Sequence, residues 1–127
     1  MEWLRRLFRR RASREELLRE GLALAMDWGD DWLSPINTRL HERHRYLGAD
    51  ELAIINDECQ AAMRWGHEIM HDQLRDGARS VDAEGFARLI HERHPWVDEE
   101  TMARLLKQSI YYAAKTGGYE RDARASG

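Results

Sequence analysis

Cysteine and proline are scarce in this sequence of 127 residues. Its single cysteine, Cys59, cannot form an intrachain disulfide, so no disulfide framework stabilises the fold and we expect a reducing, cytoplasmic location. Cys59 lies on the apolar side of a predicted helix, where we expect a buried and inert thiol. The two prolines, Pro35 and Pro95, stand where helices are predicted to begin or end, so neither interrupts a helix.

Long apolar runs and strand-like patterns are also missing. No apolar run approaches the length that crosses a bilayer, and the arginine-rich start is not followed by the apolar region of a secretory signal. No stretch alternates with a period of two, so we expect no sheet. With 43% hydrophobic and 34% charged residues, the chain has the composition of one folded domain with a genuine core.

Helical periodicity is what the sequence does contain, and it predicts an all-α, five-helix orthogonal bundle. The predicted helices cover residues 14–33, 35–44, 49–76, 82–94 and 98–116. Ser13, Ser34, Asp82 and Asp98 have the side chains of N-caps, and Gly117-Gly118 is predicted to end the last helix. We therefore divide the chain into a basic N-terminal arm (residues 1–12), one domain (13–118) and a flexible tail (119–127).

An internal repeat accompanies these helices. The run His41-Glu42-Arg43-His44 recurs fifty residues later as His91-Glu92-Arg93-His94. Each copy is followed after one residue by an aromatic and an aliphatic residue, and then by a residue that can cap a helix. The pattern predicts two helix-turn-helix pairs, residues 35–76 and 82–116, related by a pseudo-twofold axis.

One motif matches a catalytic pattern: His67-Glu68-Ile69-Met70-His71 has the form H-E-x-x-H within a predicted helix. That spacing places two imidazoles on one helix face to hold zinc, with Glu68 as the general base of a hydrolase.

Four observations weigh against a zinc site. Asp72 places a charge directly after the motif, and Leu74 stands where an extended zinc-protease motif has glycine. No third ligand is marked out, although Glu84, His91, Glu92 and His94 are all eligible. At 100° per residue, His67 and His71 lie at the edge of the apolar stripe and Glu68 points outward. We therefore commit to no metal or catalytic residue, and zinc remains the alternative cofactor.

The paired histidines offer a second metal hypothesis, in which His41/His44 and His91/His94 converge across the pseudo-twofold axis. A simpler interpretation is that each run ends a short helix, where His and Arg complement the helix dipole and the free carbonyls. We favour the simpler interpretation because it accounts for both copies without a metal.

Charge is unevenly distributed along the chain. Residues 1–14 carry a net charge of +5, whereas the rest carries −8. Within the arm, a basic amphipathic helix is predicted, and its candidate interaction residues are Trp3, Leu4, Leu7, Phe8, Arg5, Arg9 and Arg10. Such a helix can dock on its own domain, join an oligomer, enter a partner's groove or lie on an anionic membrane. The acidic body argues against nucleic acid, because it would repel a duplex.

A second candidate interaction surface combines tryptophan with acids at Trp28, Asp30 and Asp31, as at interface hot spots. Because no catalytic constellation is complete, we expect a non-enzymatic protein–protein interaction protein, such as a small adaptor, regulator or immunity-type inhibitor, with a protein partner or a homo-oligomer. The alternatives are a zinc-dependent hydrolase and attachment to an anionic membrane surface through the arm.

Overall fold

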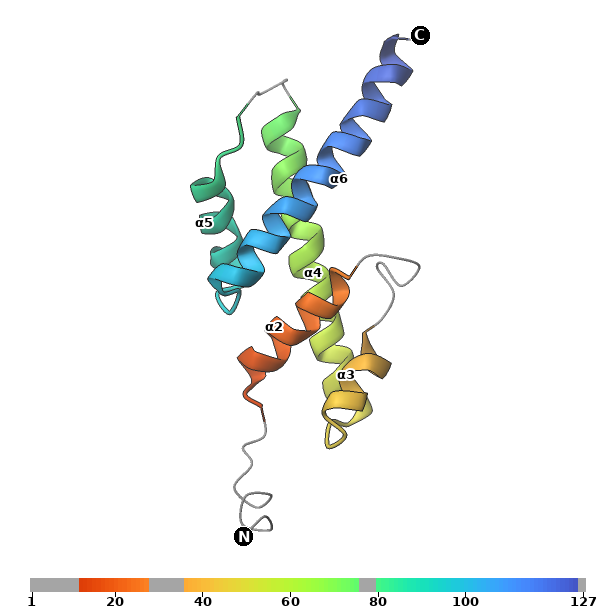
Figure 1. Cartoon of the computed structure of the whole chain (residues 1–127), viewed down its shortest axis with the longest axis vertical. Helices are drawn as coiled ribbons and strands as arrows, with labels where there is room; N and C mark the ends of the chain where they lie inside the picture. The colour runs from red at the N-terminus through yellow and green to blue at the C-terminus, as the bar shows by residue number, and fades with distance from the viewer. Residues whose placement is uncertain (1–11, 28–35, 76–79, 126–127) are drawn as a thin grey trace.

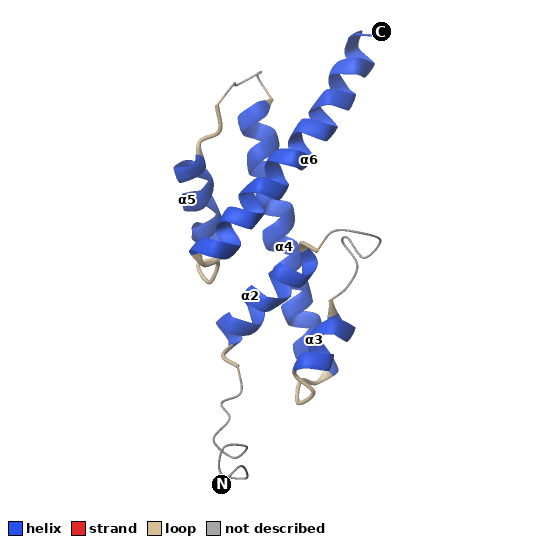
Figure 2. Ribbon diagram, viewed as in Figure 1, coloured by secondary structure: helices blue, strands red, loops and turns tan. Residues whose placement is uncertain are grey.

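A computed structural model describes residues 12–27, 36–75 and 80–125 of the protein. These parts are all-α and contain five helices and no strand (Figure 2). The helices are α2 (Arg14–Ala25), α3 (Asn37–Arg43), α4 (Ala49–Leu74), α5 (Ala83–Arg93) and α6 (Glu99–Ala125). The prediction of an all-α fold is therefore confirmed.

Helix α4 is the central element, and every other described helix contacts it. Helices α2 and α3 pack near its start, whereas α5 and α6 pack along its later turns (Figure 1). At these contacts the apolar stripe predicted for this helix is buried, including Leu52, Ile55, Met63 and Ile69. Burial of such a stripe against neighbouring helices is the main source of stability for a fold of this size.

Three predicted N-caps are confirmed. Ser13 accepts a hydrogen bond from the backbone N–H of Glu16 at 3.1 Å, and Asp82 accepts one from Gly85 at 2.9 Å. Asp98 does the same for Thr101 at 2.8 Å. Each cap satisfies one of the backbone donors that the first turn of a helix leaves free.

The first helix is shorter than predicted. It ends at Ala25 instead of reaching residue 33, and the N–H groups of Met26 and Asp27 close its last turn. The carboxylate of Asp27 lies 3.4 Å from Arg39 and 3.7 Å from Arg104, so it links α2 to both α3 and α6. These contacts are long-range, so helical periodicity gave no sign of them.

The boundaries of two other helices also differ from the prediction. Helix α3 begins at Asn37, two residues later than predicted, and its N-cap is Ile36 instead of Ser34. The N–H of Ile36 donates to Asn56 Oδ1 at 3.1 Å, so a side chain of α4 satisfies it. Helix α6 does not end at Gly117-Gly118 but continues to Ala125. The helix continues through both glycines although glycine in a helix interior costs about 1 kcal/mol relative to alanine.

Two glycines allow helices to approach α4 closely. A Cβ added at Gly21 of α2 would lie 2.8 Å from the Cys59 sulfur and 2.8 Å from Ile36 Cδ1. A Cβ added at Gly66 of α4 would lie 2.9 Å from Ser109 Oγ and 3.2 Å from Leu105. Each glycine thus faces a small residue across a helix crossing, and neither crossing has room for a side chain.

The two His-Glu-Arg-His runs form corners of matched geometry. The first ends α3 at the C-cap His44 (φ −136°, ψ 75°), and the second ends α5 at His94 (φ −133°, ψ 69°). In both corners the aromatic residue two positions later meets the histidine ring edge-on, with centroids 5.9 Å apart. The carbonyl of each C-cap histidine then accepts the N–H of Leu47 or Val97. These runs end short helices, as the simpler interpretation predicted.

Candidate functional site

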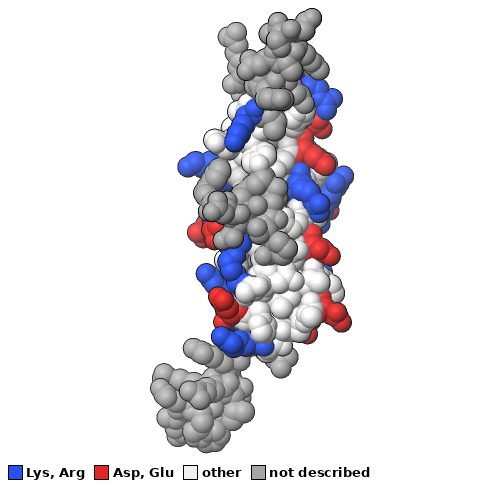
Figure 3. Space-filling view, turned by 90° about the vertical axis from the view of Figure 1, so that its right-hand side faces the viewer, with Lys and Arg blue, Asp and Glu red and all other residues white. Residues whose placement is uncertain are grey.

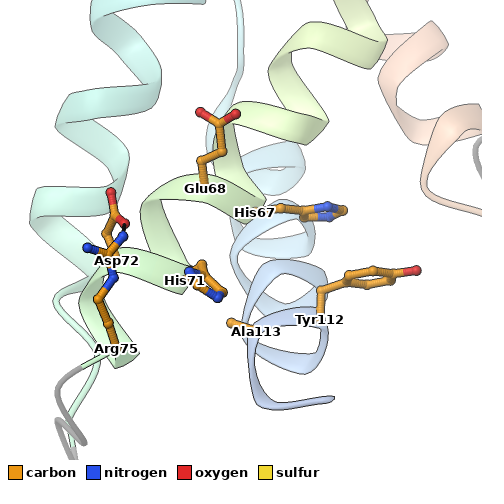
Figure 4. Close-up of a pocket in the computed structure, with 7 residues that line it drawn as sticks. All are labelled: His67, Glu68, His71, Asp72, Arg75, Tyr112 and Ala113. Atoms are coloured by element: carbon orange, nitrogen blue, oxygen red, sulfur yellow. Dashed lines mark hydrogen bonds and ion pairs between the residues drawn. The ribbon is translucent and has the colours of Figure 1, made fainter. Parts of the chain in front are cut away.

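The H-E-x-x-H motif lies in the later turns of α4, beside a cavity of about 450 Å³. The cavity is lined by His67, Glu68, His71, Asp72, Arg75, Tyr112 and Ala113 (Figure 4). His67 and His71 are half-buried and Glu68 is exposed, as helical periodicity predicted. Residues of α6 that the sequence did not suggest complete the site, namely Tyr112 and Ala113.

The His67 ring stacks on Tyr112. The two ring planes are parallel within 1°, and their centroids are 4.7 Å apart (Figure 4). Burial lowers the pKa of His67, and the nearby side chain of Gln108 opposes this shift only in part. The structure therefore favours a neutral imidazole packed against an aromatic ring.

The geometry supplies little for zinc beyond this pair of histidines. Glu68 points away from the His67 and Tyr112 rings, and Asp72 forms an ion pair with Arg75 (Figure 4). Over residues 12–27, 36–75 and 80–125, no group of three or more His, Cys, Asp or Glu side chains could hold a metal ion. None of the eligible third ligands lines the cavity: Glu84, His91, Glu92 and His94.

Two polar residues of α6 are buried near the histidine. Gln108 and Ser109 are 3% and 0% exposed, and the Ser109 hydroxyl has no hydrogen-bond partner. Buried polar groups without partners are costly, by about 1–3 kcal/mol each. Sequence reasoning did not identify either residue as part of the site, because single polar residues are common on the apolar faces of helices.

The paired histidines of the two corners do not converge on a shared site. His44 Nε2 lies 2.6 Å from Glu20, whereas His94 Nδ1 lies 3.6 Å from Glu58. Burial raises the pKa of Glu20, but hydrogen bonds from His44 and Arg43 outweigh burial, and the net pKa is lowered. For His94, burial lowers the pKa although Glu58 opposes the shift. Each histidine thus has its own acidic neighbour.

A groove of about 380 Å³ lies at the other end of the domain, between the start of α2, the first corner and α4. It is lined by Ala12, Arg14, Leu17, Tyr46, Leu47, Glu51, Ile54 and Ile55. Ile54 is 56% exposed and Tyr46 39% exposed, although both are large apolar residues. Sequence reasoning missed this groove, because its lining comes from three segments far apart in the chain.

The predicted interaction residues fall outside the described parts of the chain. These residues are Trp3, Leu4, Arg5, Leu7, Phe8, Arg9 and Arg10 of the arm, with Trp28, Asp30 and Asp31. Their proposed roles stay predictions.

Comparisons with protein families, curated proteins and solved structures found no match. Among the helices of the described residues, none combines the length and the apolar character that a membrane span requires. Function must therefore be argued from the chemistry of the cavity and the groove.

The lowered pKa of His67 predicts a pH-dependent contribution to stability. Folding favours the neutral ring, so this contribution is fully present above the unfolded pKa of about 6.5 and is lost as the pH falls through the folded pKa. His67→Leu should therefore reduce the loss of unfolding free energy between about pH 7.5 and about pH 5, measured by urea denaturation. Some loss of unfolding free energy at low pH should remain in the variant, because the pKa of His94 is also lowered. Equal acid losses in wild type and variant would contradict the assignment.

Proposed function

We propose that the protein is a non-enzymatic protein–protein interaction protein, a small helical adaptor, regulator or immunity-type inhibitor. The observation that carries this proposal is the groove with Ile54 and Tyr46 at its surface. On one side of the domain, Figure 3 shows uncharged surface in its lower half, bordered by acidic and basic side chains. An exposed apolar patch with a polar rim is typical of a surface that binds another protein.

The groove has the features of a site for an apolar helix or side chain. Leu17, Leu47 and Ile55 form a buried floor, and exposed Ile54 extends the apolar surface outward. Ionic groups are confined to Arg14 and Glu51 among the lining residues. Burying such a surface gives about 25 cal/mol per Å², and the two charged residues can orient the partner.

We further propose that the domain consists of two related units that share α4. The first unit is α2, α3 and α4; the second is the later part of α4, α5 and α6. Positions in the last two helices of each unit correspond at a spacing of fifty residues, and those in the first helix at a spacing of 45. At matching positions of the two first helices, buried residues face the core: Leu17 and Ala62, Leu18 and Met63, Gly21 and Gly66, Leu24 and Ile69, and Ala25 and Met70.

The helix crossings support this correspondence. In the first unit Gly21 meets Cys59 and Ile55; in the second, Gly66 meets Ser109 and Leu105. Cys59 and Ser109 are fifty residues apart, as are Ile55 and Leu105.

A surface contact is matched in the same way. Arg43 of the first unit binds Glu20 at 3.1 Å, and the corresponding Arg93 lies over the ring of Trp65 at 3.5 Å. Glu20 and Trp65 are 45 residues apart, so the arginine keeps its place while its partner changes from a carboxylate to an aromatic face. In repeat proteins each unit packs only on its neighbours, and the stacked units together form the surface that binds partners.

A zinc-dependent hydrolase is the second candidate, favoured by the cavity beside His67, Glu68 and His71. Two imidazoles four residues apart can bind zinc, and an exposed carboxylate between them can act as a base. The stacking of His67 on Tyr112 and the lack of a third ligand among the described residues make this candidate weaker than the first.

The two-unit proposal predicts that Ser109→Cys stabilises the protein. Cys59, its counterpart, is fully buried and lies 3.2 Å from the carbonyl oxygen of Leu18. A thiol at position 109 would replace a buried hydroxyl without a partner, so the free energy of unfolding should rise by about 1 kcal/mol. The reciprocal change, Cys59→Ser, should not raise it. Urea denaturation under reducing conditions measures both variants. A lower free energy of unfolding in Ser109→Cys would contradict the proposal that the α2–α4 and α4–α6 crossings correspond.

The interaction proposal predicts that Ile54→Asp weakens binding to a partner. A charge in the groove would have to be desolvated on binding, so the Kd should rise at least about tenfold. A partner captured by the wild-type chain is purified, and its affinity is measured for wild type, Ile54→Asp and Tyr111→Ser. Tyr111 is 51% exposed on α6 and does not line the groove, so Tyr111→Ser should bind normally. Equal affinities for all three would contradict the proposal.

We predict neither stoichiometric zinc nor metal-dependent hydrolysis. A zinc site needs a third protein ligand and an open position for water in addition to two neutral imidazoles. Metal analysis of protein purified without an affinity tag, with and without added zinc, tests this. About one zinc per chain, lost in His67→Ala, would instead establish a metal site. Loss of turnover with zinc retained in Glu68→Gln would then identify it as catalytic.

A further inference from the structure

We infer that residues 1–11 of this chain dock as an amphipathic helix in the groove formed by Leu17, Tyr46, Leu47, Ile54 and Ile55. The docking is intramolecular, so the chain covers its own groove. This inference concerns the same groove as the proposed function and describes how binding there is regulated.

The connection of the chain to the groove is the first observation. Ala12, the residue after this segment, itself lines the groove, and its N–H donates to the Tyr46 hydroxyl oxygen at 3.1 Å. The segment is therefore tethered at the rim of the groove. A short tether gives an effective concentration in the millimolar range, so even a modest contact would be well occupied.

The segment also matches the groove in length and chemistry. As a helix, eleven residues extend about 16 Å, and the stripe of Trp3, Leu4, Leu7 and Phe8 gives one apolar face. Its arginines can pair with Glu51, which lines the groove, and with Asp50 beside it in the first turn of α4, while Arg14 of the groove already lies 3.8 Å from Glu58. Both acids are exposed.

The second unit shows what covers the equivalent surface there. Trp96 corresponds to Tyr46, but it is only 6% exposed whereas Tyr46 is 39% exposed. Helix α2 crosses at that corner: Arg19 Nε donates to the Trp96 carbonyl oxygen at 2.8 Å. No described helix takes this place at the first corner. This step rests on the proposed two-unit architecture, whereas the tether and the chemical match do not.

Further along, α2 also meets α6, since Asp27 lies 3.7 Å from Arg104, the counterpart of Ile54. Arg104 has an ionic neighbour in Asp27. Because the corresponding residue, Ile54, is apolar, a segment that covers it should present apolar side chains. The arm provides apolar side chains together with arginines, so it suits both Ile54 and the acids beside it. A partner that binds the groove must then displace the arm, and its affinity falls by the fraction of chains in which the groove is covered.

Disulfide trapping in the full-length chain tests the docking. One variant carries Leu7→Cys and Ile54→Cys, and the control carries Leu7→Cys and Tyr111→Cys, at an exposed site on α6. Cys59 is retained because burial raises its pKa to about 12, which keeps its thiol unreactive. We expect the first pair to form an intramolecular disulfide at least about tenfold faster than the control. Adding Leu4→Asp and Phe8→Asp should abolish that preference.

Each other outcome overturns the inference. Equal trapping rates in the two pairs would show that the arm has no preferred place on the domain. Chains carrying Leu7→Cys alone are also mixed with chains carrying Ile54→Cys alone. Disulfide-linked dimers in this mixture, together with mainly dimers in the double variant, would show that the arm of a second copy occupies the groove. These readouts need no partner, so their failure leaves the proposed binding function to be tested separately by Ile54→Asp.

Discussion

Helix α4 is crossed by α2 and by α6, and at both crossings a glycine faces a small side chain. Gly21 meets Cys59, and Gly66 meets Ser109, at separations that leave no room for a Cβ. Helix axes can approach closely only where such residues meet, and flanking side chains then pack in the grooves on either side. Ile55 is such a flanking side chain at the first crossing, and it is buried. The positions of both corners, and of the groove and the cavity, follow from how closely these helices approach α4.

Local chemistry made much of this fold predictable. The caps Ser13, Asp82 and Asp98, and the ends of α3 and α5, depend on hydrogen bonds within a few residues, so the sequence pattern was sufficient. The end of α2 was not predictable, because Asp27 pairs with residues of α3 and α6. The close approach of helices at Gly21 was missed for the same reason, since a glycine in a helix reveals its role only with its partner.

The candidate cavity was predictable only in part. Periodicity placed His67 and His71 at the boundary of the core, and the structure confirms that position. It could not reveal that the His67 ring would stack on Tyr112, because that contact depends on where α6 crosses α4. Nor could it identify Gln108, whose buried side chain lies near His67 and affects the pKa of that histidine. A sequence motif gives the spacing of its own residues, but the residues of the facing helix α6 determine what His67 contacts.

In the proposed two-unit architecture, the two ends of the domain differ because matching positions carry different residues. His67 and Tyr112 of the cavity correspond to Leu22 and Ala62, both fully buried in the apolar core near the first crossing. Polar and aromatic groups at this end tolerate water, so an open cavity there costs little. Exposed Ile54 at the other end gains from being covered. A helix bound over the groove would therefore leave the cavity beside His67 open, and the two sites could be occupied independently.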